Sequence, residues 1–210
     1  MYNLPHFKAA SEEEVFAFMH AHPFITLCGV DAGGKPVATQ VPVLFDERDN
    51  KLFLQAHIMR KQDHTTAFEQ NPNVLAIFSG AHTYVSATWY TNPVSASTWN
   101  YQSVHARGTL RFLDEAGLHR LLTRLSETFE NNPHSTALVQ RMDESYVTNM
   151  MKAIIAFDIE ITSIEHVFKL SQNRDEKSYQ NIVHHLAEGD HDSQTIASRM
   201  EQRKDKVFHQ

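Results

Sequence analysis

Strand-like segments follow one another at very short spacing in the first part of the chain. Residues 24–30 and 37–45 are rich in β-branched and aromatic side chains, and the turn-forming run 31–36 separates them. A second polar turn at 46–50 leads into a third such segment, 51–57. Connections this short join antiparallel neighbours, because a parallel crossover needs a much longer connection. The spacing therefore predicts an antiparallel sheet or barrel.

Further strands and helices are predicted along the rest of the chain. The later strands are apolar runs bounded by turn residues, and they are expected at 74–78, 83–86 and 153–161, with a long candidate at 98–112. Gly108 in that candidate marks a bulge or a close approach of two backbones. Helices are expected at 12–21, 60–70, 114–130, 135–151 and in the tail from 175. Ser11 followed by Glu14 matches the capping box that opens the first of these helices, and helix 114–130 carries a leucine stripe, Leu118, Leu121, Leu122 and Leu125, on one face. The pattern of six strands with helices before, between and after them predicts an α+β domain built on an antiparallel barrel.

Composition limits the class of protein. Of the 210 residues, 41% are hydrophobic and 21% are charged, so a packed fold is expected. The single cysteine, Cys28, excludes an intrachain disulfide, and its place inside a predicted strand indicates a core residue rather than a nucleophile. No apolar stretch approaches the length of a membrane span, and the N-terminus lacks the order of a signal peptide. We therefore expect a cytoplasmic protein with no membrane partner.

The charge of the chain argues against a nucleic-acid-binding role. The formal net charge is −6, so no global positive field attracts the chain to phosphate backbones. The tail, residues 174–210, holds six Lys or Arg against seven Asp or Glu, and its basic residues are interleaved with acidic ones. The sequence therefore predicts no direct, sequence-specific DNA binding.

The 14 histidines do not form a metal-binding motif. The close pairs are His20 with His22 and His184 with His185, and neither has the i, i+4 spacing that places two ligands on one helical face. Gly33-Gly34 lacks the spacing of a nucleotide-binding loop and lies in a hairpin turn. No metal site and no Rossmann or P-loop nucleotide site is predicted.

Three polar or aromatic clusters remain that a plain barrel does not require. Residues 57–61 place two cations where a strand passes into a helix, a suitable place for a terminal phosphate. Residues 98–106 offer the flat rings of Trp99 and Tyr101. Residues 169–174 are polar at five of six positions, directly after the last predicted strand region. Each cluster is compatible either with a binding site or with a solvated loop.

Several motifs, taken together, carry a resemblance to a known family. In chain order they are Met1-Tyr2-x-x-Pro5-His6-Phe7, Ala38-Thr39-x-x-Pro42, Val74-Leu75-Ala76-Ile77-Phe78, Tyr84-Val85-Ser86, Trp89-Tyr90, Thr98-Trp99-Asn100-Tyr101, Val104-His105-Ala106 and Lys169-Leu170-Ser171-Gln172-Asn173-Arg174. The set resembles the PaiB-type FMN-binding negative transcriptional regulators, which are similar in turn to the FMN-binding split barrels. The resemblance implies a six-stranded antiparallel split β-barrel domain at 1–187, a helical tail at 188–210, a homodimer, and one FMN in each of two clefts at the subunit interface.

The resemblance also implies a set of cofactor-binding residues. The flavin ring would lie against the backbone of 39–42, the phosphate would lie near residues 57–61, and segments 98–101 and 169–174 would close the site, partly from the other subunit. The residues expected to bind FMN are Thr39, Gln40, Val41, His57, Arg60, Lys61, Trp99, Asn100, Tyr101, Lys169, Gln172, Asn173 and Arg174. Gln40 stands where the family usually has a histidine, and Lys61-Gln62-Asp63-His64 stands where it tends to have Ala-Asn-Pro.

Three functions are compatible with this resemblance. The first is an FMN-binding homodimeric regulatory protein. The second is a flavin-dependent oxidoreductase acting on a small molecule, resembling flavin reductases or pyridoxamine-phosphate oxidases. The third is a haem-handling split barrel, in which His105 or a histidine of the tail would be an axial ligand.

Overall fold

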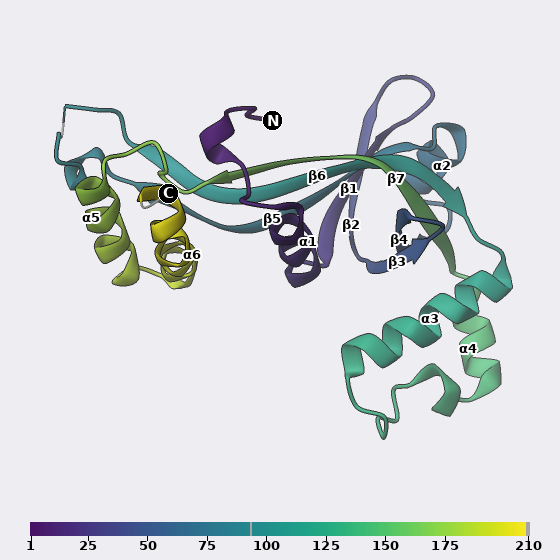
Figure 1. The fold of residues 1–210 in the computed structure, drawn as a ribbon. Coiled ribbons are helices and arrows are strands. Elements are labelled where there is room, and N and C mark those ends of the chain that lie inside the picture. Colours follow the sequence, from purple (N-terminus) through teal and green to yellow (C-terminus); the bar gives the residue numbers. More distant parts are fainter. Residues whose placement is uncertain (93, 209–210) are drawn as a thin grey trace. The chain divides into compact units, whose positions relative to one another are not determined.

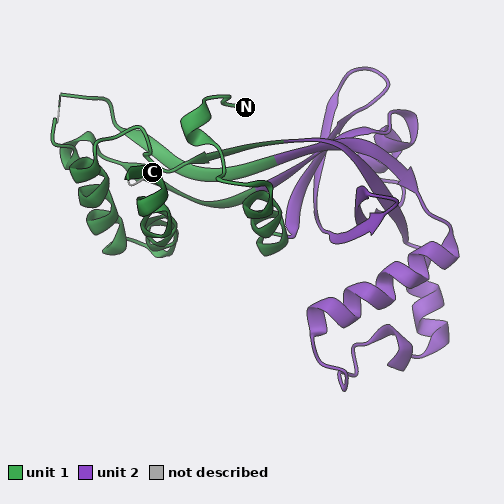
Figure 2. Cartoon of the chain, in the orientation of Figure 1, with its two compact units in different colours: residues 1–22, 79–104, 165–210 green, residues 23–78, 105–164 purple. Residues whose placement is uncertain are grey.

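The computed structural model describes residues 1–92 and 94–208, and Figure 1 shows their helices and strands. The chain divides into two compact units (Figure 2). Unit 1 comprises residues 1–22, 79–104 and 165–210, and unit 2 comprises residues 23–78 and 105–164. Three long strands, β5 (Asn73–Val85), β6 (Thr98–Phe112) and β7 (Ile154–Lys169), each begin in one unit and end in the other.

One seven-stranded sheet contains all the strands of the described chain. The remaining strands are β1 (Phe24–Val30), β2 (Pro36–Pro42), β3 (Leu44–Arg48) and β4 (Lys51–Met59). The strand order is β2-β1-β5-β6-β7-β4-β3, and the pairs β1–β2, β1–β5, β3–β4 and β4–β7 are antiparallel. In unit 2 the sheet curls until β2 also packs against β4. The predicted antiparallel, barrel-like α+β fold is confirmed at this level.

The predicted count of six strands is wrong: the sheet has seven, because the long candidate 98–112 forms β6 in addition to the six, while a division and a fusion of other predicted strands cancel. The expected strand 37–45 is divided into β2 and β3 at Val43, whose backbone N–H donates to the Pro23 carbonyl at 2.9 Å before the chain turns to pair with β4. The expected strands 74–78 and 83–86 are one strand, β5, which continues through Gly80. A methyl group at Gly80 would lie only 2.8 Å from the ring of Phe18, so glycine lets a helix pack directly on the strand.

Gly108 marks a close approach of two strands, as predicted. A methyl group there would overlap the carbonyl oxygen of Glu160 on β7. The strand β7 itself continues to Lys169, beyond the predicted end at residue 161. The loop predicted to follow it therefore begins later than the sequence indicates.

Helices of unit 2 lie between its strands along the chain. They are α2 (Asp63–Gln70), α3 (Glu115–Glu130) and α4 (Glu144–Met151). The leucine stripe predicted on α3 is confirmed: Leu118, Leu121 and Leu125 are buried in a cluster with Val147 of α4 and Ala156 of β7. This cluster packs α3 and α4 against β7.

Two predicted helices of unit 2 are shorter than expected. Helix 60–70 begins only at residue 63, because Lys61 adopts a left-handed backbone conformation with φ of 61°. Helix 135–151 is reduced to a 3-10 turn at Val139–Arg141 and α4. The Asp143 side chain accepts the N–H of Tyr146 at 3.0 Å, which makes Asp143 the N-cap of α4.

Unit 1 contains α1 (Glu12–Ala21), α5 (Glu176–Ala187) and α6 (His191–Phe208). The start of α1 is confirmed at Ser11, whose hydroxyl accepts the N–H of Glu14 at 3.4 Å. The tail is helical as predicted, and α5 and α6 bury a shared core that includes Tyr179, Ile182 and Met200. The Tyr179 hydroxyl donates to the Met200 carbonyl at 2.7 Å and joins the two helices.

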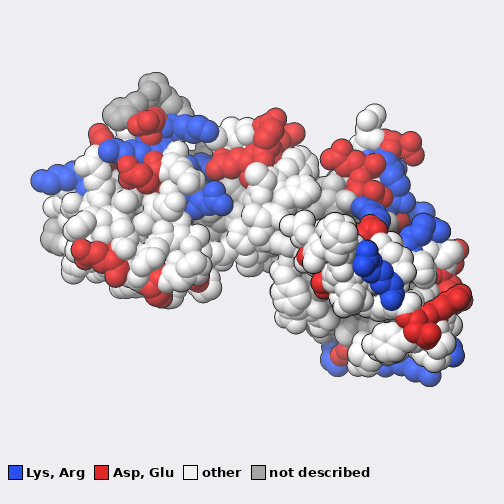
Figure 3. All heavy atoms as spheres, turned by 90° about the horizontal axis from the view of Figure 1, so that it is seen from below, with Lys and Arg blue, Asp and Glu red and all other residues white. Residues whose placement is uncertain are grey.

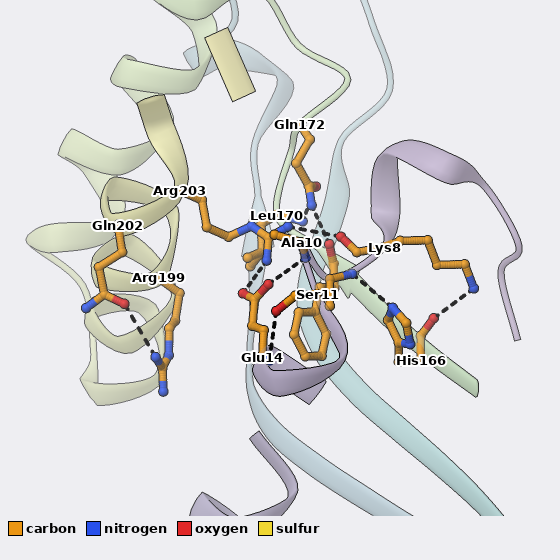
Figure 4. Close-up of polar contacts among 12 residues, drawn as sticks. Lys8, Ala10, Ser11, Glu14, His166, Leu170, Gln172, Arg199, Gln202 and Arg203 are labelled. Carbon is orange, nitrogen blue, oxygen red and sulfur yellow. Dashed lines mark hydrogen bonds and ion pairs between the residues drawn. The ribbon is translucent and has the colours of Figure 1, made fainter. Parts of the chain in front are cut away.

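The N-terminal segment is anchored to β7 and α6 in unit 1 (Figure 4). The backbone N–H of Ala9 donates to Nε2 of His166 at 2.9 Å, and Lys8 Nζ donates to the His166 carbonyl at 3.2 Å. On the other side, Arg203 pairs with Glu14 and donates to the Lys8 carbonyl at 3.0 Å. A neutral imidazole that accepts at Nε2 is therefore part of the anchor.

Candidate functional site

The outer edge of β2 in unit 2 has no hydrogen-bonded neighbouring strand in the described sheet, because β2 is terminal in the sheet order. On the inner edge, the residue that follows β2, Val43, donates its N–H to the carbonyl of Pro23. Bonded and non-bonded pairs alternate along an antiparallel ladder. The odd-numbered residues of β2 therefore bond to β1, and the N–H and C=O groups of Ala38 and Gln40 face the open edge. This edge offers alternating donors and acceptors to the polar rim of a planar ligand.

The side chains of β2 differ in what they can contribute. Val41 is 5% exposed and belongs to the core, and Thr39 is half-buried on the same face. Gln40 is exposed on the opposite face, beside Thr26 of β1. Of the three β2 residues predicted to bind the cofactor, Gln40 is thus the one with both an exposed side chain and backbone groups that face the open edge.

His57 on β4 carries a polar atom without a partner. Its Nδ1 is buried and makes no hydrogen bond to any described residue. Burial lowers the pKa of His57, so the imidazole is held neutral near pH 7. A buried polar atom without a hydrogen bond costs about 1–3 kcal/mol, and such atoms are rare in folded proteins. This atom is therefore available to a polar ligand.

Two cations follow β4 in the turn before α2. The backbone N–H of Arg60 donates to the Ala153 carbonyl at 2.8 Å, which fixes the start of the turn. The side chains of Arg60 and Lys61 are exposed and have no hydrogen bond or ion pair with any residue in the ranges 1–92 and 94–208. The carboxylate of Asp63, at the start of α2, accepts the backbone N–H of His64 at 2.7 Å and does not pair with Arg60 or Lys61. Two free cations at a helix start favour a phosphate or another anion.

A second group of predicted residues lies in unit 1, around the end of β7. Lys169 Nζ donates to the Thr98 hydroxyl and, at 2.6 Å, to the Trp99 carbonyl. It also lies 5.8 Å from the centre of the Phe7 ring. Burial lowers the pKa of Lys169, and the positive charge of Arg174 lowers it further. We call Lys169 and Arg174 the β7-end cation pair.

Arg174 is held by an aromatic ring and not by an acid. Its guanidinium lies 4.0 Å from the centre of the Tyr90 ring. This guanidinium has no hydrogen bond or ion pair with any described residue. The hydroxyl of Tyr90, a residue 6% exposed, is likewise without a hydrogen-bond partner among the described residues.

Asn100 and Gln172 use their amides inside the protein. Asn100 is fully buried; its carbonyl accepts the Ser171 hydroxyl at 3.0 Å, and its amide lies 3.4 Å from the sulfur of Met200. Gln172 accepts the Leu170 N–H at 2.7 Å and donates to the Phe168 carbonyl at 2.5 Å (Figure 4). Both side chains brace the turn between β7 and α5.

Trp99 and Tyr101 lie on the face of β6 opposite Asn100, because side chains alternate along a strand. Trp99 is 53% exposed, and the rings of His82 and Tyr84 on β5 each lie 6.0 Å from it. Tyr101 is half-buried, and burial raises the pKa of its hydroxyl. These rings form an exposed aromatic surface.

The predicted residues thus form two sets. Unit 2 holds Thr39, Gln40, Val41, His57, Arg60 and Lys61, and unit 1 holds Trp99, Asn100, Tyr101, Lys169, Gln172, Asn173 and Arg174. Ala38, Phe7 and Tyr90 were not among the predicted site residues, although all three lie in the motifs that carry the family resemblance. Their roles depend on strand pairing or long-range packing.

Two kinds of feature are absent from the described residues. In the described ranges, no three His, Cys, Asp or Glu side chains are grouped so that they could hold a metal ion. No described helix combines the length and the apolar character needed to cross a membrane.

The fold and the first set of residues define a class of protein: a split-barrel sheet with an open strand edge, an unpartnered imidazole and two free cations. The sequence matches the family described as "Putative FMN-binding domain" over residues 1–163, and the chain belongs to this family. The family assignment supports FMN as the cofactor.

A relative and two solved structures are similar to the chain. The chain is 32% identical to "Protease synthase and sporulation protein PAI 2" of Bacillus subtilis (strain 168) over 186 residues, 89% of each chain. It resembles the FAD and heme binding protein from Mycobacterium smegmatis with a TM-score of 0.55 and 18% identity, over 77% of this chain and 72% of that one. It also resembles the flavocytochrome Anf3 from Azotobacter vinelandii with a TM-score of 0.53 and 16% identity, over 77% and 68%. At these identities the structural likeness shows the fold alone.

Proposed function

We propose that the chain is an FMN-binding regulatory protein of the PaiB type, with the flavin held in unit 2. The backbone groups of Ala38 and Gln40 bind the polar rim of the ring, and Arg60 and Lys61 bind the phosphate. His57 Nδ1 bonds to the ligand as donor or acceptor, since a neutral imidazole can adopt either tautomer. Bound FMN would supply electron- or hydride-transfer chemistry. The unpartnered Nδ1 of His57 is the observation that carries this proposal.

Titration with FMN and with riboflavin tests this assignment. The two ligands share the ring and differ in the phosphate, so their affinity ratio isolates the phosphate contact. We expect FMN to bind more tightly, and we expect the double variant Arg60→Gln, Lys61→Gln to lower that preference about tenfold or more. A matched control is Lys35→Gln, which removes an exposed cation from the β1–β2 turn. Failure of both flavins to bind would overturn the proposal.

We also propose that the protein is a homodimer. The family resemblance implies this state and a contribution of segments 98–101 and 169–174 to the flavin cleft from the second subunit. A homodimer has a mass of about 48 kDa, twice the 24.1 kDa of the chain. Light scattering coupled to gel filtration gives this mass directly, and a mass near 24.1 kDa at micromolar concentration would contradict the proposal.

Regulation by this protein is proposed to be indirect. Acidic and basic side chains are interspersed on the face shown in Figure 3, and the net charge is −6. A protein that binds DNA through phosphate contacts needs a concentrated positive surface. We therefore expect no gel shift with promoter DNA at physiological salt. A shift that persists as salt is raised would contradict this expectation.

A flavin-dependent oxidoreductase is the second candidate function. The β7-end cation pair favours it, because a second cationic group on the same chain can serve a ligand other than FMN. Reduction of the bound flavin by NADH or NADPH without oxygen is the test. Bleaching of the visible flavin absorbance at a useful rate supports the enzyme, and an inert flavin excludes it for these reductants.

A further inference from the structure

The β7-end cation pair has no carboxylate partner among the described residues. The Lys169 amine bonds only to neutral oxygens, those of Thr98 and Trp99. Arg174 rests on the Tyr90 ring and bonds to no acid in the described ranges. Elsewhere in unit 1, Arg203 has a carboxylate partner in Glu14. Two half-buried cations that repel each other are costly to hold together unless an anion joins them.

The nearest carboxylate in the sequence is already engaged. Asp175 is the N-cap of α5, and its oxygens accept the N–H of Ser178 at 2.9 Å and the Ser178 hydroxyl at 2.6 Å. The Thr91 hydroxyl donates to the same carboxylate at 3.0 Å. These bonds lower the pKa of Asp175 and keep it ionised as a cap. Lys169, Arg174 and Asp175 together still carry a net positive charge.

The backbone that carries the pair is fixed before any ligand arrives. Ser171 adopts a left-handed conformation with φ of 62°, and its carbonyl accepts the N–H of Arg174 at 3.0 Å. Its hydroxyl donates to the buried Asn100, and the Gln172 side chain bonds to the backbone of Phe168 and of Leu170. A site ordered in this way loses little conformational entropy on binding.

We propose that Lys169 and Arg174 form a binding site for the oxyanion group of a second small ligand, a phosphate or a carboxylate. A guanidinium with a free planar fork beside an ammonium is well suited to either group. That this ligand is a second one, distinct from FMN, rests on the proposed function, in which Arg60 and Lys61 bind the phosphate of FMN. Binding of an anion at this pair does not depend on that assignment.

The two tryptophans of the chain make the site measurable without a label. Trp99 accepts a hydrogen bond from Lys169 at its carbonyl, and Trp89 precedes Tyr90 in the chain. Both lie in unit 1, as do Lys169 and Arg174, so their fluorescence can serve as a readout of anion binding that the variants below assign to one pair of cations. We expect inorganic phosphate to change the fluorescence of the flavin-free protein in a saturable way, and acetate to act as the carboxylate probe.

Charge-removing variants then assign the response. Arg174→Gln is expected to weaken the phosphate or acetate response about tenfold or more. Lys177→Gln, which removes an exposed cation from α5, is expected to leave it unchanged. Thermal unfolding of each variant confirms that it is folded. No response to either probe, or equal weakening by both variants, would overturn the proposal.

The same variants separate this inference from the proposed function. If Arg174→Gln removes the preference for FMN over riboflavin, the pair binds the flavin phosphate and the second-ligand site is wrong, although FMN binding stands. If phosphate binds at the pair and neither flavin binds at all, the proposed function is wrong and the anion site stands. If Arg174→Gln affects only the anion and Arg60→Gln with Lys61→Gln affects only the flavin, both are supported.

Discussion

The two cationic regions of this protein are built in different ways. Arg60 and Lys61 are exposed on a turn, and no described side chain restrains them. Lys169 and Arg174 are half-buried and are positioned by hydrogen bonds to Thr98 and Trp99 and by the ring of Tyr90. The first pair can adjust to a ligand as it binds, whereas the second is ordered in advance. Affinity at the second pair should therefore depend on residues that never touch the ligand.

The strongest test of this difference is Asn100→Ala, which changes no charge. We expect it to cost about 1–3 kcal/mol in the free energy of unfolding, because the buried Ser171 hydroxyl loses its partner. We also expect a weaker phosphate response at the β7-end cation pair and an unchanged preference for FMN over riboflavin, because that preference is assigned to Arg60 and Lys61. Urea unfolding and the two titrations measure these effects.

The control for this variant is Asn173→Ala in the same turn. Asn173 is exposed, and its loss should change stability by less than about 0.5 kcal/mol. If Asn100→Ala leaves both stability and phosphate binding at the level of this control, the turn is not braced from within and the comparison fails.

His57→Leu tests the opposite case, a buried polar group with no partner. Since no hydrogen bond is lost, the free energy of unfolding should stay the same or rise by up to about 1 kcal/mol. FMN affinity should fall about tenfold, because the ligand loses a bond to Nδ1. Thermal unfolding and fluorescence titration measure the two effects, and lower stability with unchanged FMN affinity would show that His57 serves only the fold.

Salt should separate the two pairs with a smaller effect. Exposed charges are screened more strongly than half-buried ones. Raising the salt concentration from about 50 mM to about 200 mM should weaken FMN binding roughly threefold and the response at Lys169 and Arg174 less than twofold. Equal salt dependence in the two titrations would mean that burial does not distinguish the pairs.

The smallest effect is expected from pH, through His166. Burial lowers the pKa of His166 from its ordinary 6.5, and the charges of Lys8 and Arg203 lower it further while Glu14 opposes them. The folded protein thus favours the neutral ring that accepts the Ala9 N–H. The resulting stability is present above pH 6.5 and is lost as pH falls below it.

Urea unfolding between pH 7.5 and pH 5 measures this loss. In His166→Gln the free energy of unfolding should depend less on pH than in the control variant His119→Gln on α3. Because Phe7 lies beside Lys169, loosening of the N-terminal segment should also reach the anion response, while FMN binding near Arg60 is not affected by this route. If the free energy of unfolding depends on pH as strongly in His166→Gln as in the control, His166 does not cause this pH dependence.

Features with local causes could be predicted from the sequence. The capping box of Ser11 and Glu14 and the leucine stripe of α3 each lie within a few turns of helix, and both were predicted at the right place. The position of Arg60 and Lys61 directly after a strand was also predicted, because the end of β4 is visible in the local pattern.

Features with distant causes could not be predicted. The strand break at Val43 depends on how the sheet closes, and the continuity of β5 depends on Phe18 packing over Gly80. Asn100 was expected to face a cofactor, but its amide lies against Met200, which is 100 residues away in the sequence. Which amide is free and which is buried is decided by such packing and not by residue type.

The open edge of β2 has a consequence for association between chains. An unpaired strand edge normally attracts another strand, because its free N–H and C=O groups can extend a ladder. The residues of β2 that face outward include Pro36 and Pro42, at its two ends, and proline has no N–H to donate. Only Ala38 and Gln40 can donate there. The edge thus has too few N–H donors to be extended by a strand of a neighbouring chain. Its remaining donors and acceptors are enough for a ligand the size of one ring system.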